Sequence, residues 1–327
     1  MQQIVVSKPG GPEALELREA PIPVPGPEEI LIKLAACGVN FIDIYHRTGI
    51  YPVSYPSALG LEGAGTVVRI GARVTRFKVG DRAAFCLGPL GAYAGYVAVA
   101  ETKAVIVPAF IDLETAAAIL LKGLTAEFLV RRLKPLKKGD TVLFHAAAGG
   151  VGLMACTWLA HLGVRVIGTV GSEVKADLAH QHGCDATILY RKNGFVDQVM
   201  RLTDGKGCTI VYDSIGADTF MDTLACCETR GLIVSFGNAS GPPPAISPLE
   251  LSKRGSLFLT RPTLFDYVST RQELDEAASS LFSLVQSGII RPLIGARRKL
   301  VDAASAHKEL ESRNTVGSTI LIPEPSE

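Results

Sequence analysis

The clearest chemical signal in this sequence is an apolar run that ends in small residues and continues into a helix-like stretch. Residues 141–145 read TVLFH, residues 146–152 read AAAGGVG, and the helix-like stretch extends to His161. Small residues at such a turn let the backbone approach a pyrophosphate, while free N–H groups and the helix dipole stabilise its charge. The turn carries the dinucleotide fingerprint as AxGxxG, with Ala147 where the first glycine often stands. A tight turn without a ligand is the alternative. The expected pyrophosphate contacts are Ala148, Gly149, Gly150, Val151 and Gly152.

The next apolar run indicates which dinucleotide is preferred. Residues 164–170 read VRVIGTV and should end at the adenosine ribose, where NAD-selective sites usually place an Asp or Glu. This chain instead has Gly171 and Ser172, with Lys175 one turn into the following helix. The glycine leaves room for a 2′-phosphate, and the lysine could neutralise that phosphate. The charge pattern therefore favours NADPH over NADH as the cofactor.

Neighbouring residues keep alternatives open at this ribose site. Glu173 could be argued to supply the missing acid, but we assign it to the exposed first helical turn, where the helix dipole stabilises negative charge. Tyr190, which precedes a basic pair at 191–192, is a candidate cofactor contact and could instead belong to the core. Lys175 could be an ordinary solvated helix residue.

Composition excludes several classes of protein. The chain has 327 residues, enough for about two domains, and 33 Lys and Arg against 32 Asp and Glu give a net charge of +1. General attraction to nucleic acid or anionic lipid is therefore not expected. Apolar runs are far shorter than the roughly 20 residues that span a bilayer, and no secretion signal is visible. The seven cysteines lack CxxC spacing, which predicts buried, reduced thiols and a cytoplasmic protein.

The candidate residues need a parallel sheet to position them. From about Leu113 an alanine-rich helix opens a series in which strand-like and helix-like runs alternate at the spacing of βαβ units. The expected strands are 141–145, 164–170, 187–190, 210–213, 232–236 and 256–260. The first hundred residues read instead as short strands, such as 30–34 and 66–70, with a proline-rich surface connection at 21–27. A helix at 273–287 and a strand at 318–322 complete the pattern.

The sequence resembles the medium-chain dehydrogenase/reductase superfamily, and more narrowly its quinone oxidoreductase branch, which includes zeta-crystallin. The resemblance covers essentially the whole chain, and its most specific segments are CGVNFID at 37–43, GLEG at 60–63, KGLT at 122–125, SFGN at 235–238 and LESR at 310–313. It implies an α/β protein: a GroES-like β-rich catalytic domain at 1–120 and 265–327, and a Rossmann domain with a doubly wound parallel sheet at 121–264. The active site would lie between the two domains.

The resemblance also implies that the catalytic zinc of related alcohol dehydrogenases is missing. Their Cys, His and Cys or acid ligands correspond here to Asn40, Leu61 and Leu121, which cannot form a zinc site, and Cys37 lies three residues too early. Without zinc, alcohol oxidation lacks its usual Lewis acid. An electron-poor quinone or conjugated carbonyl compound needs little activation to accept a hydride.

Roles for further residues follow from the same resemblance. Asn40, Asp43 and Tyr45 are expected to line the nicotinamide and substrate site, with Tyr51 as a lid or stacking surface. Tyr45 could donate a hydrogen bond to an oxyanion or cover the ring, and Asp43 could instead hold its loop through backbone donors. Phe236 could be a core residue and Arg313 part of a surface ion pair. The remaining expected cofactor contacts are Thr125, Ser214, Phe236, Gly237, Asn238 and Arg313.

We therefore expect a zinc-independent NADPH:quinone oxidoreductase. The family commonly forms homodimers through an edge strand of the cofactor domain, here expected at 256–260. At 317–318 the chain has Gly-Ser where many relatives carry Gly-Lys, so no basic cofactor contact is expected there. One alternative is an NADPH-dependent alkenal or enone reductase. A different-class alternative is RNA binding, as in some zeta-crystallin relatives, which the balanced charge and the lack of a basic, aromatic-interleaved stripe disfavour.

Overall fold

The computed structural model describes residues 1–190 and 194–324, which form two compact units. The first unit contains Met1–Leu124, Val268–Gln286 and Pro292–Glu327, and the second contains Thr125–Tyr267 and Ser287–Arg291. The long helix α2 (Leu113–Arg131) includes the boundary at Leu124. The division at 1–120 with 265–327 and at 121–264 remains our proposal for the functional domains. No helix of the described residues has both the length and the hydropathy needed to span a membrane.

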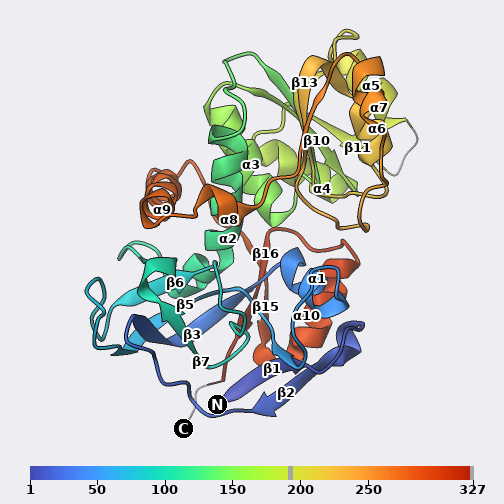
Figure 1. Cartoon of the computed structure of the whole chain (residues 1–327). Coiled ribbons are helices and arrows are strands. Elements are labelled where there is room, and N and C mark those ends of the chain that lie inside the picture. The colour runs from blue at the N-terminus through green and yellow to red at the C-terminus, as the bar shows by residue number, and fades with distance from the viewer. Residues whose placement is uncertain (191–193, 325–327) are drawn as a thin grey trace. The chain divides into compact units, whose positions relative to one another are not determined.

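The second unit is built on one six-stranded parallel sheet in the order β11-β10-β9-β12-β13-β14. Strands β10, β11 and β13 of this sheet are labelled in Figure 1. Counted along the chain from β9, this order is 3-2-1-4-5-6, which is the doubly wound order of dinucleotide-binding sheets. The predicted Rossmann fold is thereby confirmed. The strands are β9 (Thr141–His145), β10 (Arg165–Val170), β11 (Ala186–Leu189), β12 (Cys208–Asp213), β13 (Cys227–Ser235) and β14 (Phe258–Thr260). The helices are α3 (Gly150–His161), α4 (Glu173–Gln181), α5 (Phe195–Leu202), α6 (Phe220–Ala225), α7 (Pro248–Lys253) and α8 (Leu264–Tyr267).

Continuous apolar runs form these central strands because both faces of the sheet are covered. Leu143 on β9 lies opposite Ile167 on β10 and Val211 on β12, and all three side chains are completely buried. A parallel strand covered on both faces has no polar face and therefore shows no alternation in sequence. The same core fixes the register of the three strands whose carboxyl ends carry candidate cofactor residues.

The first unit contains a seven-stranded and a three-stranded sheet. The large sheet has the order β15-β16-β3-β5-β6-β8, with β7 also paired to β3, and the small sheet has the order β2-β1-β4. The strands of the large sheet are β3 (Glu29–Val39), β5 (Glu62–Ile70), β6 (Arg82–Phe85), β7 (Tyr96–Ala100), β8 (Ala104–Ile106), β15 (Ile294–Lys299) and β16 (Ser318–Ile322). The small sheet contains β1 (Gln2–Val6), β2 (Leu15–Glu19) and β4 (Ser57–Ala58), and the helices are α1 (Phe41–Thr48), α9 (Arg271–Gln286) and α10 (Ala303–Glu311).

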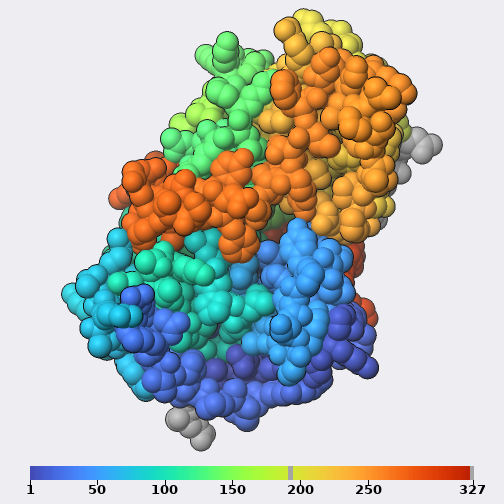
Figure 2. Space-filling view, in the orientation of Figure 1, coloured from blue at the N-terminus to red at the C-terminus, as the bar shows by residue number. Residues whose placement is uncertain are grey.

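The end of the chain returns to complete the sheet of the first unit. Thr319 on β16 lies opposite Val39 on β3 in an antiparallel pair. Strand β3 is longer than the predicted run at 30–34, and its pairing with β5 continues beyond irregularities after Leu31 and Leu34. The proline-rich connection at 21–27 lacks regular structure and is mostly exposed, as predicted, and the blue N-terminal part of the chain is visible on the surface in Figure 2.

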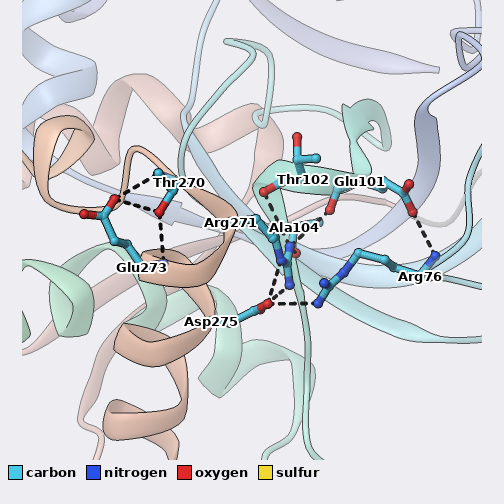
Figure 3. Close-up of polar contacts among 8 residues, drawn as sticks. All are labelled: Arg76, Glu101, Thr102, Ala104, Thr270, Arg271, Glu273 and Asp275. Atoms are coloured by element: carbon cyan, nitrogen blue, oxygen red, sulfur yellow. Dashed lines mark hydrogen bonds and ion pairs between the residues drawn. The ribbon is translucent and has the colours of Figure 1, made fainter.

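Within the first unit, one arginine ties α9 to the segment 101–104 (Figure 3). The Arg271 guanidinium donates to the carbonyl oxygens of Glu101 at 3.1 Å, Thr102 and Ala104, and it also pairs with Asp275 one turn further along the helix. Arg76 donates to the same Asp275 carboxylate at 3.0 Å. The backbone of 101–104 is thereby tied to the first turn of α9.

Candidate active site

Two of the predicted catalytic residues form the first turn of α1. Strand β3 ends at Val39, and Asn40 then takes the N-cap position of α1 with an extended backbone. The Asp43 carboxylate, three residues later, accepts a hydrogen bond from the Asn40 N–H at 2.9 Å, which satisfies a backbone donor that the helix leaves free. Asp43 is completely buried. Its carboxyl therefore holds the turn, which is the loop-holding role that the sequence left open for it.

The Asn40 side chain is fixed by Glu62. Its Nδ2 donates to Glu62 Oε2 at 2.8 Å, and the backbone N–H of Leu121 donates to Glu62 Oε1 at 2.6 Å. The Lys122 ammonium lies 3.3 Å from the same Oε2, and both charged side chains are buried. A Cβ on Gly38 would lie 2.1 Å from Glu62 Oε2, so the approach of this carboxylate to β3 requires glycine at position 38.

Burial dominates the ionisation of Asp43. Desolvation raises its pKa to about 7, although hydrogen bonds from the Tyr93 hydroxyl at 2.8 Å and the Asn40 N–H favour the charged form. Both donors act on Oδ2. Oδ1 is buried and has no hydrogen-bond partner among the described residues. The carboxyl group therefore changes charge near neutral pH, next to the backbone of Asn40.

The two predicted tyrosines pack against each other. Tyr45 on α1 is 5% exposed, and its ring centroid lies 5.1 Å from that of Tyr51 at an interplanar angle of 64°. The Tyr51 N–H donates to the Tyr45 carbonyl oxygen at 3.0 Å, which holds the following loop against the helix. The structure thus groups Asn40, Asp43, Tyr45 and Tyr51 around one short helix.

The predicted cofactor residues of the second unit meet at one edge of its sheet. The turn 146–149 follows β9, Gly171 and Ser172 follow β10, and Tyr190 follows β11. Ser214 follows β12, and the segment 236–238 follows β13. These are the carboxyl ends of parallel strands, the edge at which open α/β sheets bind their ligands. Thr125 lies within α2 at the start of the same unit, whereas Arg313 follows α10 in the first unit, so its expected contact with the cofactor stays a prediction.

The geometry of the glycine-rich turn fits a dinucleotide. Gly149 is the N-cap of α3, so the first N–H groups of this 12-residue helix point out of its amino end. A Cβ on Gly152 would lie 2.5 Å from the Ala146 carbonyl oxygen and 2.6 Å from that of Ala147. In the segment after β13, a Cβ at Gly237 would lie 2.5 Å from the Ser214 carbonyl oxygen. Glycine at these positions lets neighbouring backbones approach closely beside the edge.

The backbone at the predicted ribose end of the edge is open around Gly171. Among the described residues, a Cβ on Gly171 would have only a carbon of the Tyr190 ring, at 3.7 Å, within van der Waals range. Ser172 caps α4 by accepting from the Lys175 N–H at 3.4 Å, which places Lys175 in the first helical turn. Glu173 is exposed in that turn, as we predicted. The basic pair at 191–192 lies outside the described residues.

Two aromatic candidates also contact the core of the second unit. Tyr190 is partly buried against its hydrophobic cluster, and the Phe236 ring centroid lies 5.8 Å from that of Phe144. These contacts agree with the core role that the sequence left open for both residues. Both residues nevertheless lie at the carboxyl-end edge of the sheet, where the cofactor is expected.

A buried polar cluster beneath the cofactor edge was not apparent from the sequence. Asp213, the last residue of β12, accepts from the N–H groups of Ile215 at 2.8 Å and Gly216 at 3.0 Å. Thr223 donates to Asp213 Oδ2 at 2.8 Å and lies 3.0 Å from His145 Nε2. Burial lowers the pKa of His145, which keeps the ring neutral. The cluster fixes the loop that carries Ser214.

Comparison with known proteins identifies the family. Residues 26–109 match the alcohol dehydrogenase GroES-like domain, and residues 150–283 match the zinc-binding dehydrogenase domain. The quinone oxidoreductase of Pseudomonas aeruginosa is 52% identical over 315 residues, which are 96% of this chain and 97% of that protein. The crystal structure of Escherichia coli quinone oxidoreductase complexed with NADPH matches with a TM-score of 0.97 at 45% identity, covering 99% of this chain and 100% of that one.

This chain belongs to the quinone oxidoreductase family of medium-chain dehydrogenases/reductases. The resemblance read from its motifs is thereby confirmed. The family also extends to other reductases, since the 2-haloacrylate reductase of Burkholderia sp is 42% identical over 327 residues, 98% of each chain.

One of the matching family domains is named for zinc, but the three positions that correspond to zinc ligands carry poor or no zinc-binding side chains here. Of the positions that correspond to zinc ligands, Asn40 donates its amide to Glu62, and Leu61 and Leu121 have no donor atoms in their side chains. Within 1–190 and 194–324, no group of three or more His, Cys, Asp or Glu is arranged to hold a metal ion.

Proposed function

We propose that this family member is a zinc-independent NADPH:quinone oxidoreductase. The observation that carries the proposal is the Glu62 cluster: where a zinc-dependent relative would bind its metal, Asn40 is hydrogen-bonded to a carboxylate that is itself paired with Lys122. Such a site offers polar groups for orientation but no Lewis acid. It suits an acceptor that is already electron-poor, as quinones are.

The second unit is proposed to bind NADPH along the edge described above. The amino end of α3, beginning at Gly150, would bind the pyrophosphate, and Gly171, Ser172 and Lys175 would hold the 2′-phosphate. When bound, the cofactor supplies a hydride. In the first unit, Asn40, Tyr45 and Tyr51 would orient the acceptor, and the reduced quinone takes its proton from solvent or through a hydroxyl relay.

Steady-state oxidation of NADPH tests this substrate assignment. Purified protein should be assayed with a panel of para- and ortho-quinones beside a panel of 2-alkenals, enones and 2-haloacrylates. We expect kcat/KM to be highest for quinones. The similarity to a 2-haloacrylate reductase makes a conjugated carbonyl acceptor the second candidate, and a kcat/KM at least tenfold higher for that panel would replace the quinone assignment.

A homodimer formed through β14 is also proposed. This strand is the last in the parallel sheet, and Phe258 and Leu259 are 63% and 38% exposed. An edge strand with exposed apolar side chains is suited to pairing with another copy. Sedimentation velocity of the wild type and of Phe258→Lys tests it: we expect a dimer that the lysine converts to monomer, and a monomeric wild type would overturn the proposal.

A cytoplasmic location is proposed from the thiols. All seven cysteines are buried and unpaired by disulfides, which is the usual state in a reducing compartment. Cell fractionation tests this: recovery with periplasmic or membrane markers would contradict it.

A further inference from the structure

A series of buried hydrogen bonds, called the polar chain below, runs from α10 to the first turn of α1. His307 on α10 is completely buried, and both of its ring nitrogens have polar partners. Nδ1 lies 3.2 Å from Arg47 Nη1, and Nε2 lies 3.1 Å from the Tyr93 hydroxyl. The Tyr93 hydroxyl in turn lies 2.8 Å from Asp43 Oδ2.

The direction of every hydrogen bond in this chain follows from the donors available. A guanidinium only donates, so His307 Nδ1 must accept and the ring proton must be on Nε2. Nε2–H then donates to the Tyr93 oxygen, which leaves the Tyr93 hydroxyl proton for Asp43 Oδ2. Burial and the charge of Arg47 hold the pKa of His307 at about 3, which keeps the ring in this neutral form.

The far end of the chain is anchored near the surface. Arg47 is completely buried, donates to the Gly10 carbonyl oxygen at 3.1 Å, and pairs with the Glu311 carboxylate, whose side chain is 33% exposed. Glu311 and His307 both lie on α10, while Arg47 and Asp43 both lie on α1. One set of bonds therefore ties the two helices together over most of the length of α1.

The polar chain also determines which oxygen of Asp43 can take up a proton. Oδ2 accepts from both the Tyr93 hydroxyl and the Asn40 N–H, whereas Oδ1 has no partner among the described residues. Because Oδ2 already accepts two donors, a proton taken up by the carboxyl belongs on Oδ1. The other charged or titratable groups that act on Asp43 are Lys122, which favours the carboxylate, and Glu62, which opposes it.

We propose that Tyr93 and His307 are positioning residues, which hold Asp43 and the first turn of α1 and thereby set the orientation of Asn40 and Tyr45. The inference rests on the proposed function insofar as Asn40 and Tyr45 serve the reaction. Neither Tyr93 nor His307 is near this turn in sequence. Each buried link from Arg47 to Asp43 Oδ2 is paired, so another arrangement of these groups would leave a further buried donor or acceptor unpaired.

The test removes single links and compares them with a matched control. Tyr93→Phe deletes the hydroxyl between His307 and Asp43. Tyr212→Phe is the control, because the Tyr212 hydroxyl is equally buried and donates to the Leu129 carbonyl oxygen at 3.0 Å in the second unit. His307→Leu removes both ring contacts, while His307→Gln keeps an acceptor for Arg47 and a donor for Tyr93.

Two readouts separate positioning from general destabilisation. In Tyr93→Phe, amide hydrogen exchange at Asn40 should accelerate about tenfold, since its acceptor Asp43 is held less firmly. We expect the titration of Asp43 to give the pH profile of kcat/KM for quinone reduction a limb near pH 7, and in Tyr93→Phe this limb should move up by about one pH unit, because the carboxylate loses a donor. His307→Leu should follow Tyr93→Phe in its exchange at Asn40, whereas His307→Gln and Tyr212→Phe should remain near the wild type.

The inference is overturned if Tyr93→Phe and Tyr212→Phe give the same exchange rate at Asn40 and the same pH profile. If Tyr93→Phe does not fold, His307→Leu against His307→Gln gives the same comparison. The exchange measurement needs no substrate, so it tests the positioning chain independently of the reaction. A wild type that reduces no quinone would overturn the proposed function instead.

Discussion

Asp43 and His307 lie in one hydrogen-bonded chain, and their ionisation should affect stability with opposite signs. Burial raises the pKa of Asp43 from its usual 3.8 to about 7, so the folded protein holds this proton more tightly than the unfolded chain. The resulting stability is fully present below pH 3.8 and is lost as the pH rises through 7. Each pH unit between these values changes the free energy of unfolding by about 1.4 kcal/mol.

His307 acts in the reverse direction. Its folded pKa of about 3 lies below its usual 6.5, so stability is present above pH 6.5 and is lost as the pH falls toward 3. Between pH 5 and 6.5 the two effects oppose each other in the wild type. Removing either group should therefore expose the pH dependence of the other.

The perturbations are Asp43→Asn and His307→Gln. Asn at position 43 still accepts from the Asn40 N–H and the Tyr93 hydroxyl but cannot ionise. As the pH rises from 5 to 8, the free energy of unfolding of Asp43→Asn should increase by about 3 kcal/mol relative to that of the wild type, because the wild type loses stability over the two pH units below 7. His307→Gln should gain about 2 kcal/mol relative to the wild type as the pH falls from 6.5 to 5, because it cannot take up the unfavourable proton.

Urea unfolding at pH 5, 6, 7 and 8 provides the assay. Far-UV circular dichroism follows the whole chain, while fluorescence of the single tryptophan, Trp158 in α3, follows the second unit. The pH-dependent change in stability should appear in the circular dichroism transition and not in the Trp158 fluorescence transition, because Asp43 and His307 both lie in the first unit. Stability curves for the variants that stay parallel to that of the wild type from pH 5 to 8 would show that neither Asp43 nor His307 has the shifted pKa assigned to it.

The remaining predictions concern the cofactor edge and the Glu62 cluster. Lys175→Ala should raise KM for NADPH more than KM for NADH in steady-state assays, and equal effects would contradict the 2′-phosphate assignment. Gly152→Ala should weaken NADPH binding roughly tenfold in a fluorescence titration, because its Cβ would meet two backbone carbonyl oxygens at 2.5 and 2.6 Å; unchanged affinity would show that the turn can relax. Glu62→Gln should lower the free energy of unfolding by about 3 kcal/mol, because it leaves the buried Lys122 without its counterion, whereas a loss below 1 kcal/mol would show that the pair matters little.

The parallel sheet and its ligand edge could be predicted from the sequence because their signals are local. A strand buried on both faces is a short apolar run, and the turn at 146–152 carries its glycines within one segment. The same patterns placed Gly171 at the end of its strand, whereas Ser214 and Asn238 were assigned from the family resemblance. The register and order of the strands then bring these residues to one edge.

The polar chains could not be predicted because their members are far apart in sequence. Glu62 and Lys122 are separated by 60 residues and Tyr93 and His307 by 214. A lone buried histidine or tyrosine has no periodicity that distinguishes it from a core residue. Only the contacts of α1 with α10, and of Glu62 on β5 with Lys122 on α2, show that these groups meet.

We propose that this protein reduces quinones with NADPH and needs no zinc. NADPH oxidation with a quinone tests this when the protein has been dialysed against a chelator and zinc is determined in the same sample. We expect unchanged kcat/KM at a zinc content far below one per chain. Activity that is lost on chelation and restored by adding Zn²⁺ would contradict it.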